Sequence, residues 1–122
     1  MSNIYSHIYR RNVITIDQGT TYTDEITIEQ TEEGAPVDLT GYSVQSQLRD
    51  LTGSLAAEIA CAIPSPASGV VQRSISAEDT AALVLCIDNP LYVWGLRCVN
   101  GGNVFEIKGG ALVQPSIVEP PA

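Results

Sequence analysis

Residues 34–49 read GAPVDLTGYSVQSQLR, a turn followed by a strand whose side chains alternate in polarity. Pro36 fixes its own φ angle, Asp38 is expected to bond its own turn, and Gly41 can adopt backbone conformations that other residues disfavour. After Gly41 the alternation is regular: Tyr42, Val44, Ser46 and Leu48 share one face, and Ser43, Gln45, Gln47 and Arg49 share the other. This pattern predicts a half-buried antiparallel strand in a domain made of two packed layers.

Similar extended segments recur about every ten residues, which is the spacing of an all-β sandwich. We predict strands over residues 12–17, 21–30, 42–49, 55–63, 70–75, 91–99, 103–108 and 111–114. The segment 55–63 is rich in alanine, so a helix is conceivable there. Residues 18–20 are expected to turn the first strand into the second as a hairpin.

Two local signals complete the fold prediction. Ser76 followed by Glu78, Asp79 and alanines predicts a helix of one to two turns, because a serine hydroxyl caps the first amides and acidic residues favour the first turn. Residues 100–102, Asn-Gly-Gly, predict a tight hairpin. The expected fold is therefore all-β: an antiparallel immunoglobulin-like β-sandwich of seven to eight strands with one short helical turn.

The second predicted strand contains one residue of the wrong polarity. Tyr22, Ile26 and Ile28 share its apolar face, but Asp24 has the same parity. Since an inward carboxylate is costly without a partner, we expect the start of this strand to be frayed or bulged.

The chain has 122 residues, enough for one domain. We expect an N-terminal arm over residues 1–11, a β-sandwich over 12–114 and an extended tail over 115–122. The formal net charge of -8 argues against nucleic acid as a partner, because phosphate binding needs clustered cations. The longest apolar run, near residues 81–87, is far too short to span a membrane, so no membrane partner is expected and the chain should be soluble.

The three cysteines, Cys61, Cys86 and Cys98, lack the paired spacing of a zinc site or a redox motif. No signal peptide is recognisable at the N-terminus, so we expect free thiols in a reducing cytoplasm, with a disulfide as the minor alternative.

No enzyme is predicted. The only imidazole is His7, in the arm, so neither a nucleophilic triad nor a catalytic zinc site can be assembled, and no cofactor is expected. Turn carboxylates are more ambiguous, because loop oxygens also bind calcium. They are Asp17, Asp24, Glu32, Glu33 and Asp38. Without a recognisable ion loop, we interpret them as solvated or turn-capping groups and expect no metal.

Aromatic side chains raise the possibility of sugar binding. Tyr42, Tyr92 and Trp94 could stack on pyranose rings if they were exposed. Their inward parity instead favours packing in the core.

Two stretches resemble a known family. Residues 14–49 contain a Gly turn, an Ile-x-Ile strand, the turn Gly-x-Pro-Val-Asp-Leu-Thr-Gly and a strand ending in Leu-Arg. Residues 92–96, Tyr-Val-Trp-Gly-Leu, precede the Asn-Gly-Gly turn, and residues 107–113, IKGGALV, precede a proline. This pattern resembles small phage virion proteins, in particular the N-terminal sandwich module of upper baseplate proteins and related short tail or tail-fibre-associated proteins.

The resemblance implies a non-enzymatic structural component of a phage virion, most simply a tail, baseplate or tail-fibre adaptor that acts through subunit contacts. In that family the module precedes a larger fibre or receptor-binding domain, whereas this chain stops at Ala122, which favours an adaptor, a plug or a decoration subunit. A capsid cement protein is the alternative within the same class, and a carbohydrate-binding module is an alternative from another class.

The implied partners are other virion proteins and further copies of this chain, with assembly in the host cytoplasm and a final location in the virion. We expect both ends of the chain to dock on neighbouring subunits, because neither end has a reason to order alone. The predicted contact residues are Ile4, Tyr5, Ile8, Tyr9, Arg10, Arg11, Ile117 and Val118.

Overall fold

The computed structural model describes residues 13–29 and 35–117. Its strands and helices are β1 (Ile14–Asp17), β2 (Tyr22–Thr27), β3 (Ser43–Asp50), β4 (Leu55–Ala62), the 3-10 turn η1 (Pro66–Ser68), β5 (Val70–Ile75), α2 (Ala77–Ala81), β6 (Tyr92–Asn100) and β7 (Asn103–Gln114). The all-β prediction is confirmed, with seven strands in the described part of the chain.

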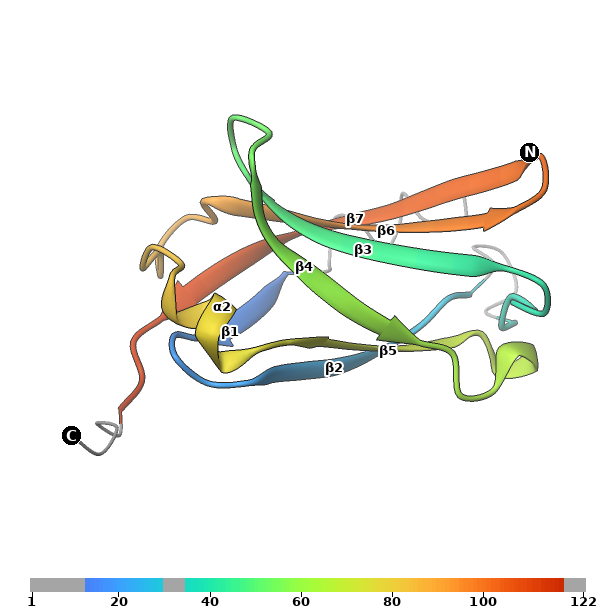
Figure 1. Ribbon diagram of the computed structural model, residues 1–122, viewed down its shortest axis with the longest axis horizontal. Coiled ribbons are helices and arrows are strands. Elements are labelled where there is room, and N and C mark those ends of the chain that lie inside the picture. The colour runs from blue at the N-terminus through green and yellow to red at the C-terminus, as the bar shows by residue number, and fades with distance from the viewer. Residues whose placement is uncertain (1–12, 30–34, 118–122) are drawn as a thin grey trace.

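The strands follow one another in the order β1-β7-β6-β3-β4-β5-β2. The strand β4 takes part in both layers. Residues 55–59 of β4 pair with β3, and residues 60–62 pair with β5. Figure 1 shows the result, with β3, β6 and β7 on one side, β2 and β5 on the other, and β4 crossing between them. The chain therefore forms a sandwich of two layers that share β4.

The corner before β6 has the features of an immunoglobulin-like domain. The short helix α2 precedes β6, and its N-cap Ser76 accepts a hydrogen bond from the amide of Asp79. Tyr92, at the start of β6, accepts a hydrogen bond of 2.8 Å on its hydroxyl from the backbone amide of Val84, eight residues upstream. A tyrosine bonded back to the backbone at this corner is a hallmark of immunoglobulin-like sandwiches.

Two predictions about the strands were wrong. The strand β1 does not form a hairpin with β2; it pairs in parallel with β7, in the opposite layer. The segments 103–108 and 111–114 form one continuous strand, because Gly109 and Gly110 keep an extended backbone and pair with Trp94 and Val93. The alanine-rich strand predicted over residues 55–63 is confirmed as β4.

The strand β2 is neither frayed nor bulged at Asp24, contrary to the prediction. Its register with β5 is unbroken, and Asp24 lies opposite Arg73. The guanidinium of Arg73 donates two hydrogen bonds to the Asp24 carboxylate, of 2.9 and 2.6 Å, and its carbon lies 4.1 Å from the centre of the Trp94 ring in the other layer. The inward carboxylate is thus neutralised by a buried cation that also connects the two layers.

The turn in residues 34–49 is built by short local contacts. Gly41 has a φ of +84°, in the region that favours glycine. The Asp38 carboxylate accepts hydrogen bonds from the amide and the hydroxyl of Thr40, at 2.9 and 2.6 Å. Pro36 lies in a single β-bridge with Glu29. These contacts fix the turn that leads into β3, in which Leu48 is buried and Arg49 is exposed.

The core fills the space between the layers with aliphatic side chains and one tryptophan. The inward parity predicted for β6 is confirmed, because Tyr92, Trp94, Leu96 and Cys98 are all buried. Tyr42 packs at the edge of this core, with its ring 5.8 Å from that of Phe105. Of the cysteines, Cys86 and Cys98 are buried and Cys61 is half-buried.

Candidate functional site

The connection between α2 and β6, residues 82–91, is held to the sandwich at several points. Leu83 and Cys86 are buried. The carbonyl of Leu83 accepts a 2.7 Å hydrogen bond from the side chain of Gln18. Cys86 exchanges backbone hydrogen bonds of 2.8 and 3.0 Å with Val113 of β7. Together with the bond from Val84 to Tyr92, these contacts fix the backbone of the connection.

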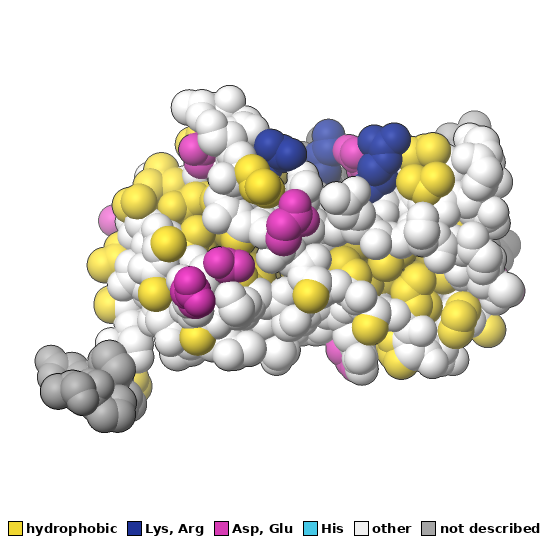
Figure 2. All heavy atoms as spheres, viewed as in Figure 1, with side chains coloured by type: hydrophobic (Ala, Val, Ile, Leu, Met, Phe, Trp, Pro, Cys, Tyr) yellow, Lys and Arg dark blue, Asp and Glu magenta, His cyan; other side chains and the backbone are white. Residues whose placement is uncertain are grey.

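Between these fixed points, aliphatic side chains point into solvent. We call them the apolar end patch: Val84, Leu85, Ile87 and Leu91, which are 60, 45, 61 and 40% exposed. Figure 2 shows hydrophobic side chains gathered at the end of the molecule that carries α2 and this connection. A single exposed aliphatic side chain needs no explanation, but several on one short connection indicate an interaction surface.

The helix α2 is fixed at the same end by hydrogen bonds to the loop between β1 and β2. The hydroxyl of Thr80, which is buried, donates a 2.7 Å hydrogen bond to the carbonyl of Thr20 and accepts one of 3.0 Å from the amide of Gly19. The start of the connection therefore cannot move without breaking buried hydrogen bonds. The patch is presented on a fixed backbone, so little conformational entropy opposes its burial by a partner.

The predicted contact residues are only partly visible. Ile4, Tyr5, Ile8, Tyr9, Arg10, Arg11 and Val118 lie outside the described residues. Ile117 is described and is 98% exposed. The chain leaves the sandwich after β7 at the end that carries α2 (Figure 1), so residues 115–117 and the apolar end patch lie at the same end of the molecule.

The sequence did carry a signal for this patch. Residues 81–87 form the longest apolar run of the chain, and the connection that carries the patch begins within it. A continuous apolar run of this length is equally consistent with a fully buried strand, so the run by itself does not indicate which of its side chains face solvent. Which side chains do so depends on the fixed points at Leu83 and Cys86, which are long-range contacts.

The candidate carboxylates are engaged separately. Asp17 accepts a 2.6 Å hydrogen bond from the side chain of Gln114, and Asp24 pairs with Arg73. The Thr40 hydroxyl, and secondly its amide, hold the pKa of Asp38 below its usual range. Glu32, Glu33 and His7 lie outside the described residues. Among residues 13–29 and 35–117, no three potential ligands gather in a way that could hold a metal ion.

Two of the three candidate sugar-stacking rings are turned inward. Tyr92 is 6% exposed and Trp94 is fully buried, so neither can contact a sugar. Tyr42 is partly buried against Phe105. The one α-helix in the described part of the chain is five residues long, too short to cross a membrane.

Comparison with known proteins gives similarity of fold only. No family model matches the chain. No curated protein matches it either. Among solved structures it is similar to "Chimeric titin Z1Z2 functionalized with a KLER exogenous peptide from decorin", with 14% identity, 86% of each chain covered and a TM-score of 0.41. It is also similar to "Tim-1", with 12% identity, 92% of this chain and 97% of that chain covered, and a TM-score of 0.43.

Proposed function

We propose that this protein is a non-enzymatic structural component of a phage virion, acting as an adaptor subunit in the tail, the baseplate or a tail fibre. The observation that carries the proposal is the apolar end patch on a fixed backbone. A surface of this kind suits permanent contact with a neighbouring virion subunit. The resemblance of residues 14–49 and 92–113 to phage baseplate modules is the reason for proposing a phage virion as the assembly that contains this subunit.

The size of the patch indicates that it acts together with other contacts. Burying the exposed part of each of its four side chains is worth roughly 1 kcal/mol. Association of two proteins costs several kcal/mol in lost freedom of motion, so the patch alone gives a weak complex. The exposed Ile117 at the same end adds apolar area, and we include it and the rest of the tail in the interface.

A mass-spectrometric census of purified particles from the source tests the location. The adaptor function predicts that the chain is present at a low, fixed copy number relative to the major capsid protein. A copy number comparable with that of the capsid protein would assign it to the shell as a cement protein. Its absence from particles that are otherwise complete would refute the virion function.

A pair of matched variants tests the surface. Val84→Lys combined with Ile87→Lys places two charges in the patch, whereas Leu51→Lys places a charge on an aliphatic side chain that is 64% exposed at the turn between β3 and β4. We expect both proteins to fold, as judged by circular dichroism, and only the patch variant to be lost from particles. Normal incorporation of the patch variant would rule out the apolar end patch as the contact. Saturable binding on a glycan array by a protein absent from particles would instead favour the carbohydrate-binding alternative.

A further inference from the structure

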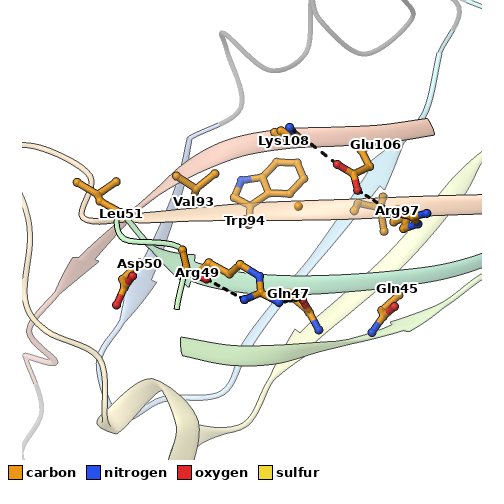
Figure 3. Close-up of a pocket in the computed structure, with 13 residues that line it drawn as sticks. Gln45, Gln47, Arg49, Asp50, Leu51, Val93, Trp94, Arg97, Glu106 and Lys108 are labelled. Atoms are coloured by element: carbon orange, nitrogen blue, oxygen red, sulfur yellow. Dashed lines mark hydrogen bonds and ion pairs between the residues drawn. The ribbon is translucent and has the colours of Figure 1, made fainter. Parts of the chain in front are cut away.

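An open hollow of about 640 Å³ lies on the outer face of the layer formed by β3, β6 and β7. Figure 3 shows the residues that surround it. The strand register places Gly95 of β6 between Gln47 of β3 and Lys108 of β7. A Cβ atom added at Gly95 would meet nothing within 4 Å, so the hollow exists where a side chain is missing.

Three cations surround this glycine. Lys108 is its direct neighbour on β7. Arg97 lies two residues further along β6, and Arg49 lies on β3 opposite Val93, which is two residues back. Because residues two apart on a strand are about 6.8 Å apart and neighbouring strands about 4.8 Å apart, all three side chains can reach a group placed above Gly95.

The charge of the hollow is opposite to that of the chain. Its lining contains three of the six Lys and Arg residues of the sequence and only two carboxylates, Asp50 and Glu106, whereas the whole chain carries -8. The Asp50 carboxylate accepts hydrogen bonds from the amides of Thr52 and Ser54 in its own turn, at 2.9 and 3.0 Å. Those hydrogen bonds hold the Asp50 carboxylate in its own turn, and the ion pairs of the hollow join Glu106 to Arg97 and Lys108.

Glu106 neutralises these cations incompletely. It lies 3.4 Å from Arg97 and 3.8 Å from Lys108, and both cation side chains are more than half exposed. Arg49 donates to the carbonyl of Gly53 and to the side chain of Gln47, at 2.9 and 2.7 Å. Among the described residues, no carboxylate forms an ion pair with Arg49.

We infer that this hollow binds carboxylate side chains of an acidic polypeptide segment from a partner protein. One carboxylate fits above Gly95 within reach of Arg49, Arg97 and Lys108. The side-chain nitrogen of Gln47 already donates a 2.9 Å hydrogen bond to Glu58, so the three cations are the donors that the carboxylate would use. In an extended segment, alternate side chains are about 6.8 Å apart, which is also the distance from the Gly95 position to the Arg97 position and from the Gly95 position to the Arg49 position along the strands. Carboxylates at positions i, i+2 and i+4 of the segment can therefore face Arg97, the space above Gly95 and Arg49 in turn.

The negative charge of the rest of the chain does not prevent this contact. At physiological ionic strength, charges more than about 8 Å apart are largely screened, whereas a bound carboxylate lies within hydrogen-bonding distance of the cations. The local excess of cations decides the affinity, and the overall charge mainly slows the approach.

A polypeptide fits the hollow better than an acidic saccharide does. Saccharides are commonly held by stacking on an exposed aromatic ring, but the Trp94 side chain is fully buried beneath this face, where it contacts Arg73. The side chains that line the hollow are mainly amides and cations, and they surround Gly95 on the outer face of the sheet. The inference does not depend on the proposed function, because the apolar end patch lies elsewhere.

Binding can be measured by fluorescence anisotropy with labelled hexaglutamate added to the full chain. Hexaglutamine serves as the uncharged probe, and oligogalacturonate as the acidic saccharide. We expect saturable binding of hexaglutamate that weakens as salt is raised, and much weaker binding of the other two. Failure of hexaglutamate to bind at low salt, or tighter binding of oligogalacturonate, would overturn the inference.

Variants that change the affinity in opposite directions locate the binding. Arg97→Gln should weaken hexaglutamate binding about tenfold through loss of one charge-assisted hydrogen bond. Gly95→Val should weaken it as much without removing any charge, because the new side chain fills the hollow. Glu106→Gln should strengthen binding by freeing Arg97 and Lys108, whereas the matched control Glu78→Gln on α2 removes the same charge and should change the affinity much less. Equal affinities of the wild type, Arg97→Gln and Gly95→Val, with folding verified by circular dichroism, would refute the site.

Discussion

Removing the carboxylate of Asp24 should destabilise the protein strongly, and removing its partner as well should restore much of the loss. The Arg73 side chain is fully buried, and Asp24 supplies both of its charge-assisted hydrogen bonds. In Asp24→Leu the guanidinium keeps its contact with the Trp94 ring but loses the one carboxylate that pairs with it among residues 13–29 and 35–117. One of its nitrogen atoms, Nη1, has no hydrogen-bond partner in the part of the chain that the structure describes.

The magnitude follows from the burial of the pair. Breaking a buried ion pair by removing one partner costs about 3 to 5 kcal/mol. Because the Asp24 side chain is 19% exposed, water can solvate part of the uncovered charge, so we expect about 3 kcal/mol. In a domain of this size that corresponds to a fall in Tm of roughly 10 °C. Arg73→Met combined with Asp24→Leu removes both charges at similar volume, so this double variant should lie within about 1 kcal/mol of the wild type.

Equilibrium unfolding in urea, followed by circular dichroism and tryptophan fluorescence, measures these differences. Coincident transitions by the two probes establish that unfolding is two-state. The double-mutant cycle then gives the coupling energy between Asp24 and Arg73. If Asp24→Leu leaves the midpoint unchanged, or if the two single changes add in the double variant, the guanidinium is solvated by water and the reasoning fails.

Three further predictions concern backbone geometry and thiol chemistry. Gly41→Val should destabilise the fold by about 1 to 3 kcal/mol, because the φ of +84° disfavours a β-branched residue; an unchanged urea midpoint would contradict this. Gly69→Ala should cost more than Gly41→Ala in the same assay, since a Cβ at Gly69 would lie 2.8 Å from the carbonyl oxygen of Val37 and that backbone cannot yield cheaply, whereas a Cβ at Gly41 would meet only the Asn100 side chain, at 3.3 Å. Burial, and secondly Cys61, raise the pKa of the Cys98 thiol to about 12, so folding holds it protonated while the unfolded thiol ionises near its ordinary value of 9.0. The contribution of the protonated Cys98 thiol to the free energy of unfolding is therefore complete below about pH 8.5 and declines as the pH rises further. Unfolding curves measured at increasing pH above about 8.5 should show a shrinking difference in the free energy of unfolding between the wild type and Cys98→Ala.

Local pattern was enough to identify the inward and outward faces of the clearest strands. Alternation in residues 42–49 and 92–98 assigned inward and outward faces correctly, because strand side chains alternate whatever the partner strand is. The hairpin after Asn100 and the cap at Ser76 were also readable, since both depend on a few consecutive residues: Asn100 pairs with Asn103 across two glycines, and Ser76 bonds an amide three residues away.

Pairing between distant segments was not readable, because alternation fixes the face of a strand and not its neighbour. In the sequence, Asp24 is a charged residue on the otherwise apolar face of its strand. Only the register of β2 with β5 brings Arg73 opposite it. The parallel contact of β1 with β7 joins residues about a hundred positions apart in the chain, which no local signal specifies. The sequence contains six Lys and Arg residues, and nothing local to Gly95 indicates that it is surrounded by any of them. Only the register between β3, β6 and β7 places Arg49, Arg97 and Lys108 around Gly95.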